Sequence, residues 1–263
     1  MTTQTADQAT RWRTLLDALA ERRSLSVAEA AELLGVSAAT VRRDFGELAR
    51  RQLATRTHGG VVATSVAYEL PARYRTSAGD PRERIAAEAA RRVRLGSVVG
   101  FNGGTTTSAV ARHLAEREDV RDAAEDAVTI VTNALNIAAA MVLRPSIRTV
   151  VIGGVARPQS YELHGPFASR VLADLLLEQL FLGVDALGPE GASCRHLGES
   201  VINAQMCEHA RRVTIVAASP KLERVSLARI CELDRVDELI TDTDAPAEQV
   251  ARLREAGVAV TLV

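Results

Sequence analysis

Apolar residues recur at helical spacing in three separate runs within the first fifty positions. Steps of three or four residues separate the members of each run, which is the period of a helix that buries one face. The runs are Trp12, Leu15, Leu16 and Leu19, then Ala30, Leu33 and Leu34, then Val41, Phe45 and Leu48. The pattern therefore predicts three short amphipathic helices, over residues 9–22, from residue 26, and over residues 37–51.

Polar residues mark where the second and third of these helices begin. Ser26-Val-Ala-Glu29 has the form of a capping box, in which each side chain accepts a bond from the other residue's backbone N–H. Gly35-Val36 ends this helix, and Ser37 can cap the next one. Two short helices joined by a brief turn with glycine form a helix-turn-helix, whose second helix enters the DNA major groove.

The third helix has an outward face with small residues and two arginines. Between residues 42 and 56 five arginines stand against two acidic residues, Asp44 and Glu47, so positive charge gathers here. Guanidinium groups at these positions can reach phosphates or guanine edges, although an ordinary solvated arginine face is the alternative. The candidate DNA-binding residues of this segment are Ser37, Ala38, Ala39, Thr40, Arg42 and Arg43.

A change of period after residue 51 predicts a small hairpin. Residues 53–57 and 61–63 are β-rich and flank His58-Gly59-Gly60, a sequence typical of a glycine turn. A hairpin directly after a recognition helix is a wing, and Arg56 and His58 would then face the DNA backbone. For His58, a turn residue that bonds only locally is an equal alternative.

The remainder of the chain alternates continuous Val/Ile runs with helical runs. This alternation is typical of a parallel sheet that helices cover on both faces. The predicted strands are residues 97–101, 128–132, 148–152, 180–184, 213–217, 238–241 and 258–262. The predicted helices are residues 81–94, 105–117, 134–142, 166–177, 199–211 and 247–256. We therefore expect a DNA-binding domain over 1–63, a linker over 64–80 and a larger ligand-binding domain over 81–263.

A glycine- and threonine-rich loop follows the first strand of the larger domain. Ligands bind at the carboxyl ends of the strands in such folds, and a helix N-terminus there offers free N–H groups to an anion. The loop comprises Asn102, Gly103, Gly104, Thr105, Thr106 and Thr107. It has neither dinucleotide nor Walker A spacing, so we expect a single phosphate and no cofactor. A glycine turn with threonine caps is the alternative.

Four other strands of this sheet also end in polar residues. Their carboxyl ends are followed by Thr132 and Asn133, by a Gly-Gly pair with Arg157 close behind, by Asp185, and by Ser219-Pro-Lys221. Because parallel strands bring these ends to one edge, the sequence predicts a pocket for a small phosphorylated polyol. Lys221 is the single lysine among 32 Lys plus Arg residues, which is a weak sign of a specific role.

Composition limits the class of protein. The chain has 263 residues, 47% hydrophobic and 25% charged, with a net charge of −1, so any nucleic-acid binding must be local. The three cysteines lack a CxxC pattern, and the polar N-terminus lacks the apolar core of a signal peptide. We therefore expect a cytoplasmic protein with reduced thiols. The histidines show no metal-binding spacing, so no metal site is expected.

Two sets of motifs resemble one protein family. LLGVSAATVRRDF, followed by RTHGGV, is similar to the DNA-binding signature of the DeoR/GlpR family of bacterial repressors. GGTTT, TNAL, LHGPFA, FLGVDALGPEG and AASPKL resemble that family's sensor domain, in the same order. The resemblance implies a small winged helix-turn-helix domain followed by a Rossmann-like, mostly parallel sheet domain resembling ribose-5-phosphate isomerase.

The resemblance also implies the function. Such a protein binds operator DNA as a symmetric oligomer, a dimer or tetramer, and responds to a phosphorylated sugar or a related metabolite. The 104–107 loop would hold the phosphate, Thr132 and Asn133 would line the pocket, and Asp185 and Lys221 would contact the sugar.

The chain departs from the family pattern at four positions. Gln52 stands where glycine is usual, and Gly46 softens the recognition helix. Asn102 and Ala218 stand where the family often has aspartate, which removes acceptors for hydroxyl groups. The loss also disfavours base catalysis. The alternative function is a sugar-phosphate isomerase-like enzyme with an accessory DNA-binding unit, which would use Asp185 as its catalytic carboxylate, with Glu199 as the second choice.

Overall fold

The computed structural model describes residues 8–22, 24–50, 53–57, 59–63 and 79–263. The chain forms two compact units, Met1–Arg75 and Thr76–Val263. Within the described residues, the first unit is a helix-turn-helix with a small sheet, and the second is an α/β unit around a seven-stranded sheet. The predicted fold class is therefore confirmed.

The first unit contains the three predicted helices, α1 (Gln8–Arg22), α2 (Val27–Leu34) and α3 (Ala38–Arg50). The predicted hairpin is β2 (Ala54–Arg56) and β3 (Gly60–Ala63). A third strand, β1 (Ser24–Ser26), was not predicted. It pairs antiparallel with β3, so that Leu25 lies opposite Val61. Three residues are too few to show a strand period, so only the pairing reveals β1.

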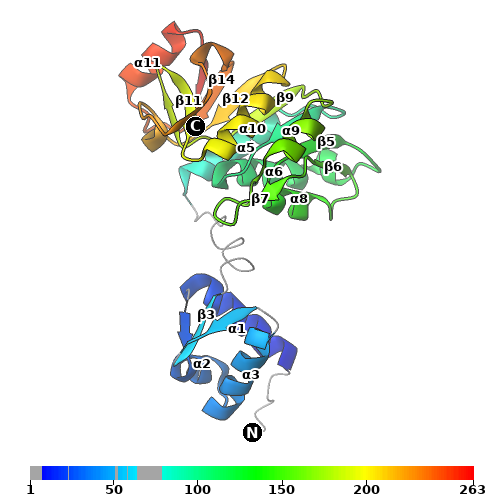
Figure 1. Ribbon diagram of the computed structural model, residues 1–263, viewed down its shortest axis with the longest axis vertical. Coiled ribbons are helices and arrows are strands. Elements are labelled where there is room, and N and C mark those ends of the chain that lie inside the picture. Colours follow the sequence, from blue (N-terminus) through cyan, green and yellow to red (C-terminus); the bar gives the residue numbers. More distant parts are fainter. Residues whose placement is uncertain (1–7, 23, 51–52, 58, 64–78) are drawn as a thin grey trace. The chain divides into compact units, whose positions relative to one another are not determined.

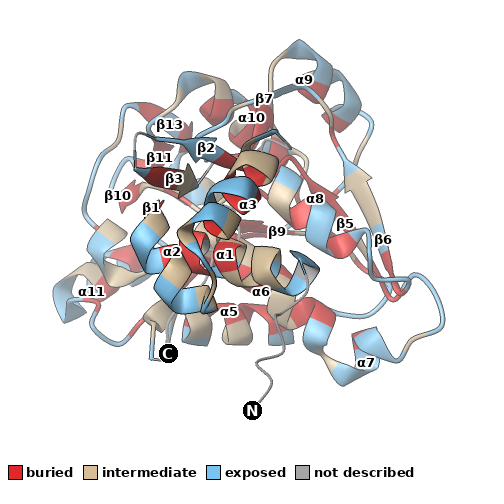
Figure 2. Cartoon of the chain, turned by 90° about the horizontal axis from the view of Figure 1, so that it is seen from below, coloured by how far each residue is buried: buried red, intermediate tan, exposed pale blue. Residues whose placement is uncertain are grey.

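The core of the first unit comes from the apolar faces of these elements. Val41, Phe45 and Leu48 of α3 are buried, as the spacing predicted, and pack with Leu15 and Leu19 of α1. Buried and exposed residues therefore alternate along α3 (Figure 2). The packing fixes which face of α3 is left for solvent.

The second unit is built on an all-parallel sheet with the strand order β15-β14-β12-β9-β4-β5-β6 (Figure 1). All seven predicted strands are present. Their bounds are β4 (Val98–Phe101), β5 (Val128–Thr132), β6 (Ile147–Val151), β9 (Gln179–Leu182), β12 (Val213–Val216), β14 (Glu238–Thr241) and β15 (Ala259–Leu262).

Helices cover both faces of this sheet. One face packs against α5 (Pro81–Arg91), α6 (Thr105–Glu116) and α8 (Leu135–Met141), with α7 (Glu118–Arg121) beside them. The other face packs against α9 (Pro166–Leu172), α10 (Leu197–Glu208) and α11 (Ala247–Glu255). The predicted helix over residues 166–177 extends five residues beyond the end of α9. The predicted helix over residues 199–211 begins two residues after the start of α10.

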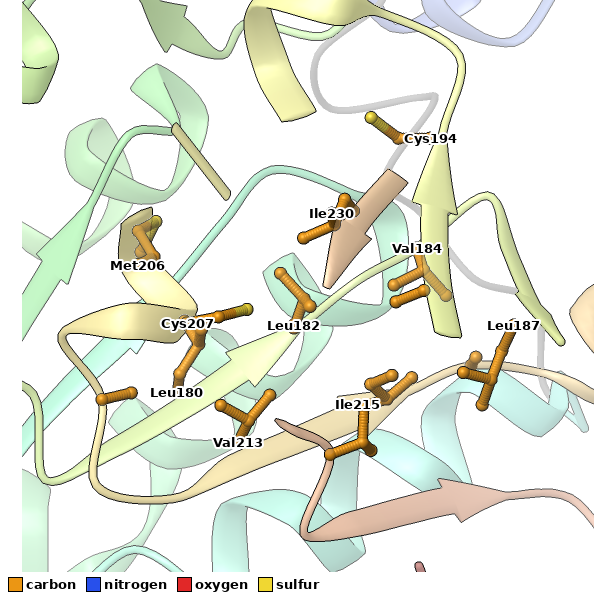
Figure 3. Close-up of a cluster of buried hydrophobic side chains, with 14 of the residues drawn as sticks. Leu180, Leu182, Val184, Leu187, Cys194, Met206, Cys207, Val213, Ile215 and Ile230 are labelled. Atoms are coloured by element: carbon orange, nitrogen blue, oxygen red, sulfur yellow. The ribbon is translucent and has the colours of Figure 1, made fainter. Parts of the chain in front are cut away.

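Alternate residues of the central strands supply the two cores. Leu180 and Leu182 of β9 join the cluster that contains α10 (Figure 3), whereas Phe181 joins the cluster on the opposite face. Phe181 stacks on Phe101, with 5.6 Å between the ring centroids. Because both faces are covered, apolar residues predominate in the central strands β4, β5, β9 and β12.

Two small antiparallel sheets were not predicted. β10 (Ala186–Gly188), β11 (Gly191–Cys194) and β13 (Ala228–Cys231) form one, and β7 (Val155–Ala156) pairs with β8 (Leu163–His164) in the other. Their strands are two to four residues long. Both lie in segments that connect the main strands.

Candidate functional site

The turn between α2 and α3 has the predicted capping geometry. The Ser26–Glu29 capping box is complete, and Gly35 ends α2 in the left-handed region with φ 63°. The backbone N–H of Thr40 donates to Ser37 Oγ at 3.2 Å, so Ser37 caps α3. These bonds fix the angle at which α3 leaves the turn.

The outward face of α3 presents two arginines. Arg42 and Arg43 are exposed, and neither makes an ion pair or hydrogen bond with any described residue. Ala39 is exposed beside them, and Ala38 and Thr40 are half-buried at the helix start. A close approach by another molecule is therefore possible at this end of α3, with both guanidinium groups free to bind it.

Arg56 is exposed in β2, on the hairpin that follows α3. His58, which was assigned to the tip of this hairpin, lies outside the described residues, as does Gln52. The β2–β3 pairing places Arg56 opposite Val61. A cationic strand next to the helix-turn-helix fits the predicted wing.

Asp44 holds α3 in place from its buried side. Arg11 of α1 donates to both carboxylate oxygens, from Nε at 2.9 Å and from Nη2 at 3.2 Å. Trp12 Nε1 donates to Oδ1 at 3.1 Å. Asp44 therefore belongs to the scaffold of the recognition helix, a role that its position beside Arg43 in the sequence does not reveal.

In the second unit, the strand order changes direction between β4 and β9. From β4 the chain proceeds to β5 and β6 on one side, and then to β9, β12, β14 and β15 on the other. Asn102, directly after β4, joins the two strands at this point. Its amide donates to Gly183 O at 2.9 Å and accepts from Gly183 N at 2.8 Å. In open α/β sheets this crevice is the usual ligand site.

The loop after β4 leads into the N-terminus of α6. Gly104, at φ 140°, is the cap residue, and no side chain caps the first turn. Thr106 and Thr107 are buried, and Thr107 Oγ1 donates back to Gly104 O at 3.2 Å. Since the threonines do not cap the helix, the backbone N–H groups of its first turn can bind an anion.

One cation contacts this helix end, and a second lies after the carboxyl end of β12, beside the segment that follows β9. Arg82 Nη1 donates to Thr105 Oγ1 at 3.3 Å while the same side chain pairs with Asp80. Lys221 lies in the short 3-10 turn after β12 and donates from Nζ to Val184 O at 2.5 Å. Burial lowers the pKa of Lys221, an effect that the nearby Asp185 opposes and that Arg82 reinforces.

Asp185 follows β9 and is only partly free. Its Oδ2 accepts from the backbone N–H of Arg195 at 3.0 Å, and its Oδ1 is 3.2 Å from the Arg195 guanidinium. The carboxylate therefore faces cations rather than another acid.

A buried carboxyl group that the sequence did not single out lies against the same loop. Glu162 is 6% exposed, and a Cβ on Gly103 would lie 2.4 Å from its Cγ, so glycine is required there. Asn133 Nδ2 donates to Glu162 Oε2 at 3.0 Å, and Asn203 Nδ2 reaches the same oxygen at 3.4 Å. Burial, and then the Glu199 carboxylate, raises the pKa of Glu162 to about 7.

Glu199, at the start of α10, is the second buried acid of this region. Arg157 Nη1 donates to Glu199 Oε1 at 3.2 Å, and Ser160 Oγ donates to the same oxygen. Arg157 was expected to bind an anionic ligand, and in this structure its partner is Glu199. Two acceptor atoms near these acids are available to a ligand. The side-chain oxygens of Asn133 and Asn203 are buried without a hydrogen-bond partner among the described residues.

Thr132 is buried between β4 and β5. Its hydroxyl donates to Phe101 O at 2.7 Å and accepts from Ala134 N at 3.0 Å. It therefore positions Asn133.

The predicted residues fall into two groups around the switch point, which is the place between β4 and β9 where the strand order changes direction. Hydrogen-bond donors, at the α6 N-terminus and Lys221, form one group. Asn133 provides the acceptors of the other. Sequence reasoning missed Arg82, Glu162 and Asn203, and held Glu199 only as a second choice for a catalytic acid.

The described residues contain neither a membrane-spanning helix nor a cluster of metal-binding side chains. No helix of the described part is long and apolar enough to cross a membrane. Over the same residues, no group of three or more His, Cys, Asp and Glu side chains could hold a metal ion.

Comparison with known families matches both units. Residues 11–66 match the DeoR-like helix-turn-helix domain, and residues 78–243 match the DeoR C terminal sensor domain. The second match alone covers more than half of the chain. Each match falls on the unit whose geometry fits its description.

Curated relatives match along nearly the whole chain. The putative aga operon transcriptional repressor of Escherichia coli O157:H7 is 32% identical over 95% of this chain and 91% of its own. The HTH-type transcriptional repressor CsqR of Escherichia coli K12 is 31% identical, over 94% and 93% of the two chains. The glycerol-3-phosphate regulon repressor of the same strain is 26% identical, over 97% and 99%. All three are named as repressors, not as enzymes.

Solved structures are more distant. Ribose 5-phosphate isomerase A of Methanocaldococcus jannaschii has a TM-score of 0.39 and 17% identity, over 56% of this chain and 55% of its own. A similarity of this extent carries no argument about activity.

Proposed function

This chain belongs to the DeoR family of transcriptional regulators, and we propose that it represses carbohydrate-metabolism genes in response to a phosphorylated metabolite. The observation that carries the proposal is the capped helix α3, whose two arginines are exposed and unpaired among the described residues. A DNA-binding helix needs cations that are not already neutralised within the protein. The operator is the partner of this face.

The DNA contact is divided between base reading and phosphate binding. Ala38 and Ala39 allow the start of α3 to approach the groove, and Ser37 and Thr40 lie at the same end. Arg42 and Arg43 supply the guanidinium groups that recognise guanine edges or phosphates. Arg56, together with His58, would contact the backbone from the wing.

Replacing one of these arginines tests the DNA contact. We expect Arg43→Ala to weaken binding to the promoter region of the chain's own gene by about tenfold or more, since a specific arginine contact contributes roughly 1–3 kcal/mol. Fluorescence anisotropy at several salt concentrations measures this. Arg13→Ala, at an exposed position of α1, is the matched control. Equal affinity of both variants and the wild type would contradict the assignment of α3.

The effector site lies at the switch point of the sheet. The α6 N-terminus, Arg82 and Lys221 would bind the phosphate, because they present N–H groups and positive charge at one end. Asn133 and Glu162 would accept bonds from hydroxyl groups at the other end. The two ends together favour a phosphorylated sugar or polyol. Asn102 contributes to the site by holding β4 and β9 together.

A thermal-shift assay tests the effector site. At about 100 times its dissociation constant, a ligand stabilises by about 2.7 kcal/mol, or roughly 5–10 °C for a unit of this size. A panel of sugar and polyol phosphates is compared with the same compounds without phosphate. Lys221→Met should remove the shift, whereas Arg84→Met, at an exposed position of α5, should retain it. A full shift with Lys221→Met would exclude this lysine from the site.

The assembly and location of the chain complete the proposal. A single winged helix reads a short site, so we expect a dimer or tetramer that binds paired half-sites in the cytoplasm. The DNA-binding domain would be residues 1–63 and the sensor domain residues 81–263, joined by a linker over 64–80.

A further inference from the structure

The second unit leaves large apolar side chains exposed on three adjacent elements. They are Val155 of β7, Phe167 and Val171 of α9, and Leu197 and Val201 of α10. Phe167 and Leu197 are the most exposed of the five, at 66% and 65%. These five residues are called the α9–α10 face below. Single exposed apolar residues are normal, whereas a contiguous group of them indicates a surface that binds another molecule.

Contacts beneath these side chains place them on one surface. The rings of His164 and His196, which lie just before α9 and at the start of α10, are 5.3 Å apart between centroids. The two helices therefore begin side by side, and they pack against each other (Figure 2). A Cβ on Gly154 would lie 3.1 Å from Ala168 Cβ, which brings β7 against α9. The residues that these elements turn outward thus form one face.

Helix α9 has a second stripe besides the one that it buries. The second stripe comprises Phe167, Arg170, Val171 and Asp174, all of them exposed. Steps of three or four residues separate its members, so they lie along one side of the helix and of the turn that ends it. A helix that packs only on its own core needs one apolar stripe. The second stripe therefore indicates a second packing partner.

The charges on this stripe indicate what that partner is. Neither Arg170 nor Asp174 makes an ion pair or a side-chain hydrogen bond with any described residue. A two-fold axis reverses the direction of the stripe in a second copy, and this brings each arginine within reach of the other copy's aspartate. A partner with charges of a single sign would leave one of the two residues unpaired. The stripe is complementary to itself.

We propose that the α9–α10 face is the interface between two copies of this chain, related by a two-fold axis that crosses α9. The apolar side chains form its centre, and two Arg170–Asp174 pairs between the copies lie at its rim, the usual division of an interface. A stable dimer buries roughly 800 Å² of each partner. The contact therefore extends from the five apolar residues onto the polar residues around them.

Helix α10 connects this interface to the proposed effector site. Leu197 and Val201 are exposed, whereas Glu199 and Asn203 of the same helix are buried. A ligand that binds at Asn203 would therefore act on a helix that also contacts the second copy. This consequence rests on the proposed function, whereas the interface itself does not.

Analytical ultracentrifugation of the full-length chain tests the interface in the absence of DNA and effector. The wild type should have the mass of a dimer or tetramer. Phe167→Glu and Leu197→Glu should each raise the dissociation constant by about thirtyfold or more, as expected for central interface residues. Leu143→Glu is the matched control, because Leu143 is 79% exposed in the turn after α8 and lies outside the face. It should associate like the wild type.

Charge reversal distinguishes a contact between copies from one within a copy. Arg170→Glu and Asp174→Arg should each weaken self-association, because each places like charges opposite one another across the axis. An equal mixture of the two variants should associate with the affinity of the wild type, since opposite charges then meet in both pairs. Mixing cannot restore a contact within one chain, and association in the mixture also shows that both variants are folded.

Four outcomes would overturn the proposal. They are a monomeric wild type, unchanged association of both Phe167→Glu and Leu197→Glu, a mixture that associates no better than the separate charge-reversed variants, and an equal loss of association in Leu143→Glu. None of these measurements involves DNA or a ligand. The interface can therefore fail while the DNA and effector assignments stand, and the reverse also holds.

Discussion

Glu162 shows how its surroundings change the behaviour of one carboxyl group. It is buried beside Gly103, its hydrogen-bond donors are neutral amides, and Glu199 is close. These conditions raise its pKa from 4.5 to about 7. The native state therefore binds this proton more tightly than the unfolded state does. The associated stability is fully present below pH 4.5 and is lost as the pH rises through 7.

Replacing this carboxyl should flatten the dependence of stability on pH. The shift in pKa corresponds to about 3 kcal/mol. From pH 5 to pH 8 the wild type should therefore lose roughly that much unfolding free energy, and Glu162→Gln should not. The difference in stability between the variant and the wild type should shift by this amount in favour of the variant. Urea unfolding followed by circular dichroism at both pH values measures it. Glu190→Gln, at an exposed position, should keep the wild-type dependence. A Glu162→Gln variant with unchanged pH dependence would show that this carboxyl is not held in its neutral form.

At the scale of elements, α3 depends on α1 as much as on its own sequence. The Arg11–Asp44 pair is largely buried, with side-chain exposures of 13% and 2%. The Arg50–Glu47 pair on the same helix is exposed, at 71% and 33%. Only the first pair crosses from one helix to another. The orientation of the recognition helix therefore relies on a contact that lies away from the DNA face.

Removing the buried carboxylate should destabilise the first unit. Asp44→Ala removes the buried carboxylate that accepts from Arg11 and Trp12, and breaking a buried ion pair typically costs about 3–5 kcal/mol. Glu47→Ala should cost less than about 1 kcal/mol. Trp12 is the only tryptophan, so its fluorescence during urea unfolding reports the first unit. Similar losses in the two variants would show that the buried pair does not hold α3.

Much of the architecture could be predicted because the elements that matter have strong local signals. The apolar spacing of α3 and the Ser37 cap are readable within a few positions, and so are the strands that helices cover on both faces. The small strands β1, β7 and β8 could not be predicted, since two or three residues show no period. The site residue Glu162 escaped prediction because its partners Asn133 and Asn203 lie 29 and 41 positions away.

At the scale of the whole molecule, each unit has its own core and its own proposed partner. The first core joins α1, α2 and α3 to a three-stranded sheet, and the second fills both faces of the parallel sheet. The family to which the chain belongs pairs the same two kinds of domain. The central claim is therefore that occupation of the sensor site changes the affinity of α3 for its operator.

The most direct test measures the DNA affinity with and without the effector. Anisotropy titrations with promoter DNA are repeated in the presence of the sugar or polyol phosphate that gives the largest thermal shift. We predict a change in Kd of about tenfold, within the usual range of coupling between two sites, and no change for Lys221→Met. If that compound stabilises the wild type and its DNA affinity stays the same, the two units are not coupled, and the central claim is contradicted.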